Sequence, residues 1–323
     1  MKILVTTVPF GDKNRLPLEM LEANNIEYLI NPLNKKLTEN ELAELITDFD
    51  ALVAGTETIS EYVMSKAPNL KMISRVGIGL DGIDLLAARK RGIKISYTPD
   101  APAPAVAELT MGLMLTLLRS IHISNSELHR GEWQRHFGYR IAEVTIGIIG
   151  LGRIGHRILN RISAFGSPRL LLNDIAPNPE ITKKFKVEWV PKETIYKESD
   201  LISLHIPLTS QTKGMIDRSN LEMMKKDAMI INTSRGGIIN EQDLYDVMRE
   251  GHLSGAAIDV FENEPYSGPL GEIERCILTA HMGSMSVDCR TRMEIEAMEE
   301  AIRFCKGKPL HEEVPDEEYE MRL

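Results

Sequence analysis

Three side chains with complementary chemistry follow short apolar stretches in the second half of the 323-residue sequence. Arg235 follows the stretch 228–233, Glu264 comes soon after 255–258, and His281 directly follows 276–280. Apolar runs of this length are typical of buried strands, and parallel strands bring their carboxyl ends to one edge of a sheet, where ligands bind. The sequence therefore predicts that an arginine, a carboxylate and an imidazole converge at one edge.

This set of side chains suits the chemistry of a 2-oxo acid. The planar fork of Arg235 can bind the carboxylate and the carbonyl oxygen of such a substrate. His281 can donate a proton to the developing alkoxide, or accept one in the oxidative direction, while Glu264 bonds the other ring nitrogen and fixes the tautomer. Taken singly, each residue is more often structural, so the prediction depends on the three together.

A glycine-rich turn predicts a dinucleotide site upstream of these residues. Gly150, Gly152 and Gly155 have the spacing G-x-G-x-x-G, between a strand pattern at 144–149 and a helical pattern at 153–164. In that setting the first glycine makes the turn, the second lets the backbone approach a pyrophosphate, and the third lets helix and strand pack closely. A turn without a ligand is the alternative, and the flanking strand and helix disfavour it.

The type of dinucleotide is predicted from Asp174, which ends the next predicted strand. An acidic group at this distance from the glycines can accept both hydrogen bonds of the adenosine ribose. Its charge repels a 2′-phosphate, and no Arg or Lys follows in 175–178. NAD is therefore predicted rather than NADP.

Short apolar stretches alternate with helical patterns along most of the chain, which is typical of α/β folds with parallel sheets covered on both faces. We predict two Rossmann-like, doubly wound parallel-sheet domains, a flavodoxin-like substrate lobe and an NAD-binding lobe. The predicted strands of the first lobe are 3–8, 26–30, 51–54, 71–76 and 93–97. Those of the second are 144–149, 169–173, 201–206, 228–233, 255–258 and 276–280.

The segments between and after these strands predict the domain organisation. The Pro-rich stretch 98–104 is expected to cross between lobes, because proline fixes φ and disfavours helix in the preceding residue. A single helix from Ala105 to about His129 is apolar around much of its circumference, which indicates either the core or a subunit interface. The interface, and with it a homodimer, is the favoured interpretation. A helix at about 287–304 returns to the first lobe, and the acidic tail 311–323 is expected to be loosely held. The predicted domains are 1–98 with 286–323 for the substrate, and 99–285 for NAD.

Composition excludes several classes of function. The net charge of −9 argues against nucleic acid or an anionic membrane as partner. Three cysteines are too few for a disulfide framework or a zinc site, so no metal is expected and a reduced cytoplasm fits best. The first residues are predicted to form a strand rather than a signal peptide, and the apolar stretch 106–118 is too short to cross a bilayer.

With these residues in place, the sequence resembles the D-isomer-specific 2-hydroxyacid dehydrogenases, especially their phosphoglycerate dehydrogenase-like branch. The resemblance covers nearly the whole chain, with its motifs in the right order at 75–81, 105–108, 147–155, 204–209, 231–237, 257–265 and 279–284. It implies a substrate lobe built from both chain ends, an NAD lobe between them, a cleft that closes, and dimerisation through the NAD lobe.

The resemblance also implies roles for individual residues. It makes Arg235, Glu264 and His281 the catalytic set, with His281 as proton donor. With the glycine motif, it gives as cofactor contacts Gly150, Gly152, Arg153, Ile154, Gly155, Asp174, His205, Pro207, Thr233, Ser234, Arg235, Asp259, His281 and Gly283. Among these, His205 is expected beside the adenine and Asp259 near the carboxamide. The substrate contacts are Arg75, Val76, Gly77, Arg235 and His281, with N–H groups around 76–79 holding the substrate carboxylate.

The sequence departs from the family pattern at a few positions. The family often has Asn where this chain has Pro102, and usually has Pro where it has Ala280. Phosphoglycerate enzymes commonly carry, at the position of Ala54, an Arg that helps to bind the substrate phosphate. Arg75 and Arg135 remain as candidate phosphate partners, the latter across a dimer. No appended regulatory domain is expected after residue 323.

The expected function is hydride transfer between NAD(H) and C2 of a small 2-oxo or 2-hydroxy acid, with phosphoglycerate and hydroxypyruvate or glyoxylate as candidate substrates. A 2-imino acid reductase on the same scaffold is an alternative, because it needs the same hydride donor, carboxylate anchor and proton source. An NAD-sensing, corepressor-like binding protein is a second alternative. The acidic charge and the lack of long interaction tails disfavour it.

Overall fold

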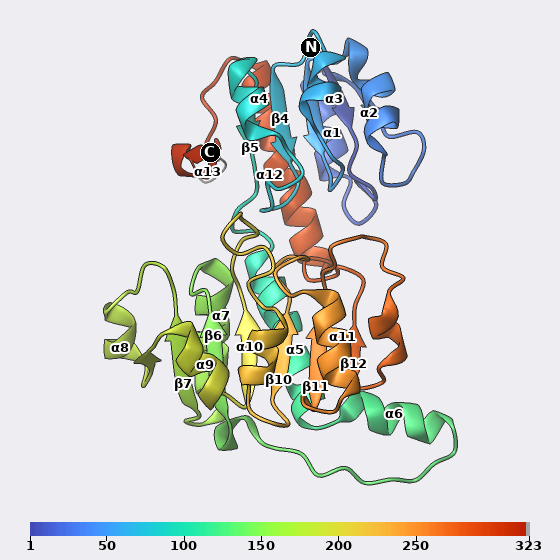
Figure 1. Ribbon diagram of the computed structural model, residues 1–323. Helices are drawn as coiled ribbons and strands as arrows, with labels where there is room; N and C mark the ends of the chain where they lie inside the picture. Colours follow the sequence, from blue (N-terminus) through green and yellow to red (C-terminus); the bar gives the residue numbers. More distant parts are fainter. Residues whose placement is uncertain (321–323) are drawn as a thin grey trace. The chain divides into compact units, whose positions relative to one another are not determined.

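The computed structural model describes residues 1–320, and the chain divides into two compact units. The first unit contains Met1–Pro102 and the segment from Met285 onward, and the second contains Ala103–Ser284. Residues 99–102 stay with the first unit because the helix after them begins only at Ala103. Each unit has its own parallel sheet (Figure 1), so the predicted α/β class with two doubly wound domains is confirmed.

The sheet of the first unit has five strands in the order β2-β1-β3-β4-β5. This is the flavodoxin order predicted for the substrate lobe. All four residues of β3 are buried, as expected for a parallel strand covered on both faces. The strands are β1 (Lys2–Val5), β2 (Glu27–Ile30), β3 (Ala51–Ala54), β4 (Met72–Arg75) and β5 (Lys94–Ser96), and the helices between them are α1 (Leu16–Ala23), α2 (Glu39–Leu45), α3 (Glu61–Ser65) and α4 (Leu85–Lys90).

The chain returns to this sheet through α12 (Val287–Cys305), as predicted. The helix packs on β3, β4 and α1, and Ser74 Oγ in β4 donates a hydrogen bond to the carbonyl oxygen of Ala297 at 2.7 Å. The first unit is therefore built from two distant parts of the sequence.

The prediction of a loosely held tail is wrong for residues 311–320. The N–H of Val314 donates to the carbonyl of Ile95 at 2.9 Å, next to an antiparallel bridge between Ser96 and Glu313. Helix α13 (Asp316–Glu320) then buries Tyr319, whose ring lies 3.6 Å from the Arg89 guanidinium carbon. Buried Val314 and Tyr319, together with the ion pairs Lys94–Glu313 and Arg89–Asp316, therefore dock this acidic segment. Residues 321–323 lie outside the described part of the chain.

The second unit has a seven-stranded parallel sheet in the order β12-β11-β10-β9-β6-β7-β8. The strand order reverses between β6 and β9, which is where doubly wound sheets bind ligands. The strands are β6 (Thr145–Ile149), β7 (Arg169–Asn173), β8 (Glu188–Trp189), β9 (Leu201–Leu204), β10 (Met229–Asn232), β11 (Gly255–Ile258) and β12 (Cys276–Leu278). The helices are α5 (Ala103–Leu118), α6 (Ile121–His129), α7 (Arg153–Ile162), α8 (Glu180–Lys184), α9 (Lys192–Glu198), α10 (Arg218–Met223) and α11 (Glu241–Arg249).

The helix predicted from Ala105 to His129 is instead two helices, α5 and α6, that meet at 67°. Ser120 lies between them with a φ of +49°, a left-handed conformation that ends an α-helix. Helix α5 packs on α7, β10 and β11 of its own unit, so its buried apolar residues belong to the core of that unit.

None of the described helices is by itself long and apolar enough to span a membrane. The bent pair of α5 and α6 meets that criterion by length and composition only.

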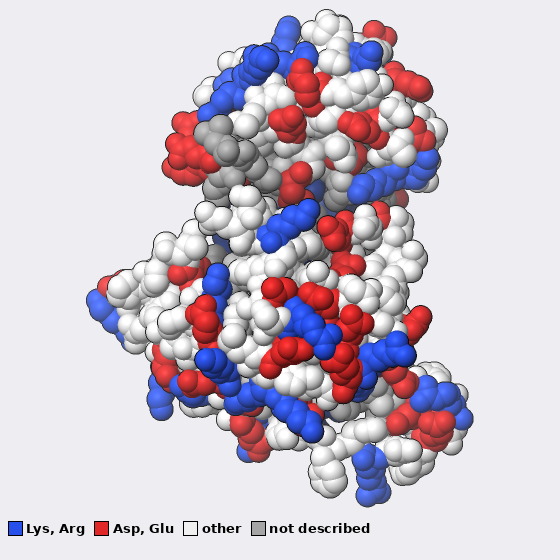
Figure 2. All heavy atoms as spheres, viewed as in Figure 1, with Lys and Arg blue, Asp and Glu red and all other residues white. Residues whose placement is uncertain are grey.

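Charged side chains of both signs are mixed over the visible face of each unit (Figure 2). Arg169, for example, lies 2.8 Å from Glu188 and 2.7 Å from Glu198. Exposed pairs of this kind contribute about 0–1 kcal/mol each to stability.

Candidate active site

The glycine-rich turn joins β6 to α7 in the geometry predicted for a pyrophosphate site. Gly150 has a φ of +93°, and a Cβ there would lie 2.3 Å from the carbonyl oxygen of His205. A Cβ on Gly155 would lie 2.1 Å from the carbonyl oxygen of Gly150, so α7 packs directly on the turn. No other residue type fits either position without displacing backbone.

The start of α7 is arranged to receive an anion. Gly152 is the N-cap residue, no side chain caps the first N–H groups, and the space around a Cβ at Gly152 is open to 4 Å. Arg153 and Ile154 form the first turn, with Arg153 exposed. Uncapped N–H groups and the helix dipole attract phosphate at such an end.

Asp174 lies beside this turn at the end of β7. One carboxylate oxygen accepts the N–H of Leu151 at 2.6 Å, and the other accepts that of Ala176 at 2.9 Å. These bonds fix the carboxylate next to the glycine-rich turn, the position predicted for a contact with the ribose of a dinucleotide.

His205 closes the other side of the turn, at the end of β9. Its Nε2 lies 2.7 Å from Ser203 Oγ, and burial lowers the pKa of the ring to about 3. The imidazole is therefore neutral at physiological pH, and its main contact with the turn is through its own backbone. Pro207 follows in an exposed loop, where its carbonyl oxygen accepts the hydroxyl of Thr212 at 2.6 Å.

The turn after β10 is locked by side-chain hydrogen bonds. Thr233 and Ser234 are buried; Thr233 Oγ1 lies 2.8 Å from Thr110 Oγ1 of α5, and Ser234 Oγ donates to Asn232 Oδ1 at 2.7 Å. Asn232 Nδ2 donates to the carbonyl of Arg235 at 2.8 Å, and Arg235 Nη1 donates to that of Ser234 at 2.6 Å. The backbone that carries Arg235 is therefore fixed.

Asp259, at the end of β11, is 1% exposed and organises the loop after β12. Its carboxylate accepts the Thr279 hydroxyl at 2.6 Å and the N–H groups of Met282 and Gly283 at 2.9 Å. Burial raises the pKa of Asp259, and these hydrogen bonds oppose that rise. The backbone carbonyl of Asp259 also accepts the N–H of His281 at 2.8 Å. One residue thus holds both ends of the turn that presents His281.

His281 and Glu264 form a hydrogen-bonded pair. Nδ1 of His281 lies 3.0 and 2.9 Å from the two carboxylate oxygens of Glu264, one of which also accepts the N–H of Phe261 at 3.1 Å. A carboxylate only accepts, so Nδ1 carries a proton and Nε2 is the atom available for proton exchange. The His281 side chain is 41% exposed.

The three residues of the predicted catalytic set follow β10, β11 and β12, which are consecutive at one end of the sheet. A Cβ on Gly236 would lie 2.0 Å from the carbonyl carbon of Phe261, so the turn of Arg235 contacts the loop of Glu264 directly. The structure places all three at the same edge, with direct hydrogen bonds between Glu264 and His281.

The predicted substrate residues of the first unit follow β4. Arg75 Nε donates to the carbonyl of Gly79 at 3.0 Å and Nη1 donates to that of Val76, so the guanidinium shapes this loop. The N–H of Gly77 donates to Thr98 Oγ1 at 2.8 Å, and that of Val76 to the Ala54 carbonyl at 2.9 Å. A substrate carboxylate bound there would have to exchange partners with these groups.

Sequence reasoning missed a buried carboxylate in the same unit. Glu57, just beyond β3, is 3% exposed; it accepts the Thr6 hydroxyl and, at 3.0 Å, the N–H of Gly55. Strand β3 lies between β1 and β4, so Glu57 stands at the end of the sheet that also carries the 76–79 loop. The available signal was a charged residue three positions after a fully apolar strand.

Comparison with known proteins identifies the family. The family model described as D-isomer specific 2-hydroxyacid dehydrogenase, NAD binding domain, matches residues 111–283 of this chain. Hydroxypyruvate reductase of Thermotoga maritima is 38% identical, over 84% of this chain and 89% of that protein. The chain belongs to the D-isomer specific 2-hydroxyacid dehydrogenase family. This confirms the predicted family, NAD as cofactor, and an oxidoreductase acting on CH–OH donors.

Two further relatives of this dehydrogenase extend the comparison. D-3-phosphoglycerate dehydrogenase of Methanocaldococcus jannaschii is 39% identical over 95% of the chain, which spans only 58% of that relative's length. The crystal structure of a glyoxylate reductase from Paecilomyes thermophila superposes with a TM-score of 0.86 at 26% identity, covering 98% of this chain and 99% of that one.

Replacing Asp174 tests the assignment of the ribose site. We expect Asp174→Arg to lower the preference for NADH over NADPH, measured as the ratio of kcat/KM values, by about tenfold or more, because charged hydrogen bonds are worth about 1.5–3 kcal/mol. Glu180→Arg, an exposed acidic residue at the start of α8, serves as control. An unmodified enzyme that already prefers NADPH would contradict the assignment.

Proposed function

We propose that this dehydrogenase acts as a reductase of small, unphosphorylated 2-oxo acids of the glyoxylate and hydroxypyruvate type. The observation that carries the proposal is the Glu264–His281 pair, at the same sheet edge as Arg235 and in the unit that holds the dinucleotide turn. NADH, when bound, supplies the hydride for C2.

The residues of the second unit would share the remaining work. The Glu264 carboxylate holds the Nδ1 proton of His281, so that Nε2 donates its proton to the alkoxide oxygen as the carbonyl is reduced. Arg235 binds the substrate carboxylate and carbonyl oxygen through its guanidinium, which stabilises the negative charge on that oxygen. Asp259 keeps the imidazole in place by fixing the backbone on both sides of it.

The preference for an unphosphorylated substrate is inferred from the first unit. Arg75 already donates to two carbonyl oxygens of its own loop. Ala54, opposite Arg75 in the sheet register, has no charge to offer a phosphate. Glu57 adds a negative charge at this end of the sheet, which repels a phosphate and favours a hydroxyl group. Of the three relatives described above, one is named a hydroxypyruvate reductase, one a glyoxylate reductase and one a D-3-phosphoglycerate dehydrogenase.

A spectrophotometric screen of NADH oxidation tests the substrate class. We expect a higher kcat/KM for hydroxypyruvate and glyoxylate than for phosphohydroxypyruvate. Glu57→Gln keeps the hydrogen-bond acceptor but removes the charge, so it should shift this ratio toward the phosphorylated substrate by about tenfold. Glu61→Gln, a surface residue of α3 paired with Arg91, is the control.

Three outcomes of the screen would contradict this assignment. One is an unmodified enzyme that prefers phosphohydroxypyruvate, and another is a ratio that Glu57→Gln leaves unchanged. The third is a rate that rises strongly with added ammonia, which would indicate reduction of a 2-imino acid instead.

The proton donor is tested by replacing His281. We expect His281→Ala to lower kcat by about 10²–10⁴-fold while NADH still binds, because the variant loses the general acid but not the nucleotide site. The measurements are steady-state kinetics and NADH fluorescence titration. His129→Ala, an exposed histidine of α6, should behave like the unmodified enzyme. Near-normal turnover of His281→Ala would remove this residue from the mechanism.

The proposal includes a homodimer formed through the second unit. After α6, residues 130–140 run without regular structure and are all exposed. They include Trp133, 79% exposed, and Phe137, whose side chain is fully exposed. Large aromatic side chains left in water are typical of a surface that another protein covers.

We expect Trp133→Glu combined with Phe137→Glu to convert the dimer to a monomer, because two charges replace the aromatic contacts. Light scattering after size-exclusion chromatography measures the mass in solution. Phe165→Glu, an exposed aromatic residue elsewhere on the same unit, should leave the mass unchanged. A monomeric unmodified protein, or a double variant that stays dimeric, would argue against this interface.

The cytoplasm is the compartment that we assign. Cys276, Cys289 and Cys305 are free thiols, and burial raises the pKa of Cys276 to about 12. Buried thiols without disulfides fit a reducing compartment.

A further inference from the structure

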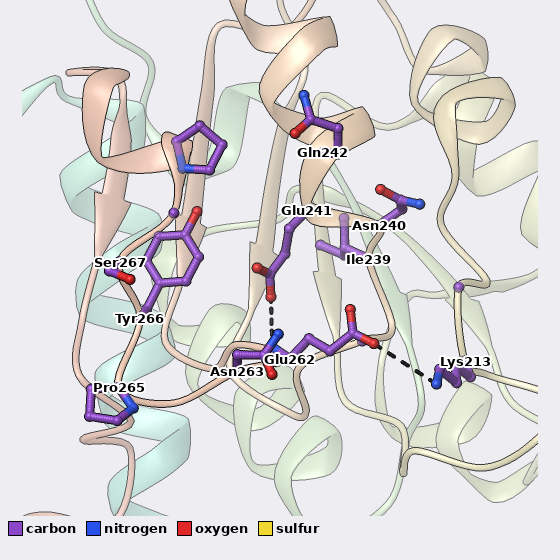
Figure 3. Close-up of a pocket in the computed structure, with 14 residues that line it drawn as sticks. Lys213, Ile239, Asn240, Glu241, Gln242, Glu262, Asn263, Pro265, Tyr266 and Ser267 are labelled. Carbon is purple, nitrogen blue, oxygen red and sulfur yellow. Dashed lines mark hydrogen bonds and ion pairs between the residues drawn. The ribbon is translucent and has the colours of Figure 1, made fainter.

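We infer that Glu241, outside the residues that contact cofactor or substrate, is a positioning residue for the Glu264–His281 pair. The inference rests on the proposed function, since it concerns the geometry of the proton donor. Glu241 lines a cavity of about 490 Å³ together with Lys213, Glu262 and Tyr266 (Figure 3). This cavity adjoins the loop that leads to Glu264.

Glu241 holds the backbone of that loop from a rigid element. Its carboxylate accepts the N–H of Glu262 at 2.6 Å (Figure 3). Glu241 opens α11, whose start is fixed by Asn240 accepting the N–H of Asp243 at 3.0 Å. The helix buries Leu244 in the core of the unit. The hydrogen bond therefore ties the loop to the packed part of the second unit.

The peptide held by Glu241 is next to the one that holds Glu264. Phe261 N–H donates to Glu264 Oε1 at 3.1 Å, and the same oxygen lies 3.0 Å from His281 Nδ1. The ring of Phe261 stacks on Tyr266, with centroids 4.1 Å apart and planes 19° from parallel. In the turn 261–264, Glu241 thus binds the N–H of Glu262, and Glu264 binds the N–H of the preceding residue, Phe261.

The turn that carries Arg235 packs against the Phe261–Glu262 peptide, which Glu241 also contacts. A Cβ on Gly236 would lie 2.0 Å from both the carbonyl carbon and the oxygen of Phe261, and 2.5 Å from the nitrogen of Glu262. The Phe261–Glu262 peptide therefore adjoins both the turn that carries Arg235 and the Phe261 N–H that binds Glu264. If Glu241 releases it, the two side chains lose their fixed relation, and a shift of about 1 Å in a catalytic group can cost up to about 10² in rate.

The surroundings of Glu241 disfavour the charged form of its carboxyl group. Burial raises the pKa of Glu241, and the neighbouring charges of Glu262 and Glu264 raise it further. Glu262 itself points its side chain to an exposed pair with Lys213 at 3.9 Å (Figure 3). Removing the Glu262 charge therefore leaves the backbone hydrogen bond intact, which makes Glu262→Gln a matched control.

Replacing Glu241 tests the inference through the separation of kcat from KM. We expect Glu241→Ala to lower kcat for 2-oxo acid reduction by about tenfold while the KM for NADH stays within about twofold. Glu241→Gln should recover most of the rate, because the amide oxygen can still accept the Glu262 N–H. Glu262→Gln should match the unmodified enzyme. Gly236→Ala, which displaces the same peptide from the other side, should lower kcat in the same way.

Several results would overturn the inference. One is a kcat for Glu241→Ala within about twofold of the unmodified value, and another is an equal loss in Glu241→Gln and Glu241→Ala. If thermal unfolding shows that Glu241→Ala is not folded, the inference is tested with Glu241→Gln and Gly236→Ala. A normal kcat in Gly236→Ala then overturns the inference. Failure of the proposed function is distinct, because the unmodified enzyme would then reduce no 2-oxo acid or His281→Ala would remain active.

Discussion

The geometry of the catalytic edge depends on the hydrogen bonds made by one buried carboxylate. Asp259 receives a hydroxyl and two N–H groups from the loop after β12, and its carbonyl receives the N–H of His281. A buried charge is costly unless its hydrogen bonds are satisfied, so the loop is held in the one arrangement that satisfies them. His281 itself has a φ of +47°, a conformation that a residue other than glycine keeps only where its surroundings impose it.

Around this anchor, the second unit builds its site almost entirely from strand ends and backbone contacts. Gly150, Gly155 and Gly236 occupy places where a side chain would collide with backbone. These contacts set the distances between neighbouring turns more firmly than flexible side chains could. The side chains proposed to carry the chemistry are thus mounted on rigid turns, as catalysis through preorganised groups requires.

The sequence predicts most strands well because each has a short apolar centre, as in Ala51–Ala54 and Leu201–Leu204, where all four residues are buried. It misses β8, which has two residues and no apolar pattern. It also joins α5 to α6, because the apolar spacing continues past Ser120, whose positive φ has no signature in residue type. The ion pair and the stacking that dock α13 join residues far apart in the sequence. A prediction from the acidic composition of the segment alone was therefore wrong.

The candidate site shows the same division. The position of Arg235, Glu264 and His281 at one sheet edge could be predicted because each follows a recognisable strand, and the glycine spacing marks the turn between β6 and α7. Glu57 and Glu241 could not, because both act through hydrogen bonds to backbone or hydroxyl groups of residues distant in sequence. The fold determines which groups these glutamates contact. In the sequence alone, they cannot be told apart from any other glutamate in a loop or at the start of a helix.

The order in which the chain is synthesised gives the discontinuous first unit a particular history. Its five strands leave the ribosome early, yet α12, which covers β3 and β4, emerges only after the whole of the second unit. Until then, apolar side chains of those strands lack the helix that packs against them. The continuous second unit can complete its core first, so the part of the enzyme that is translated first is finished last.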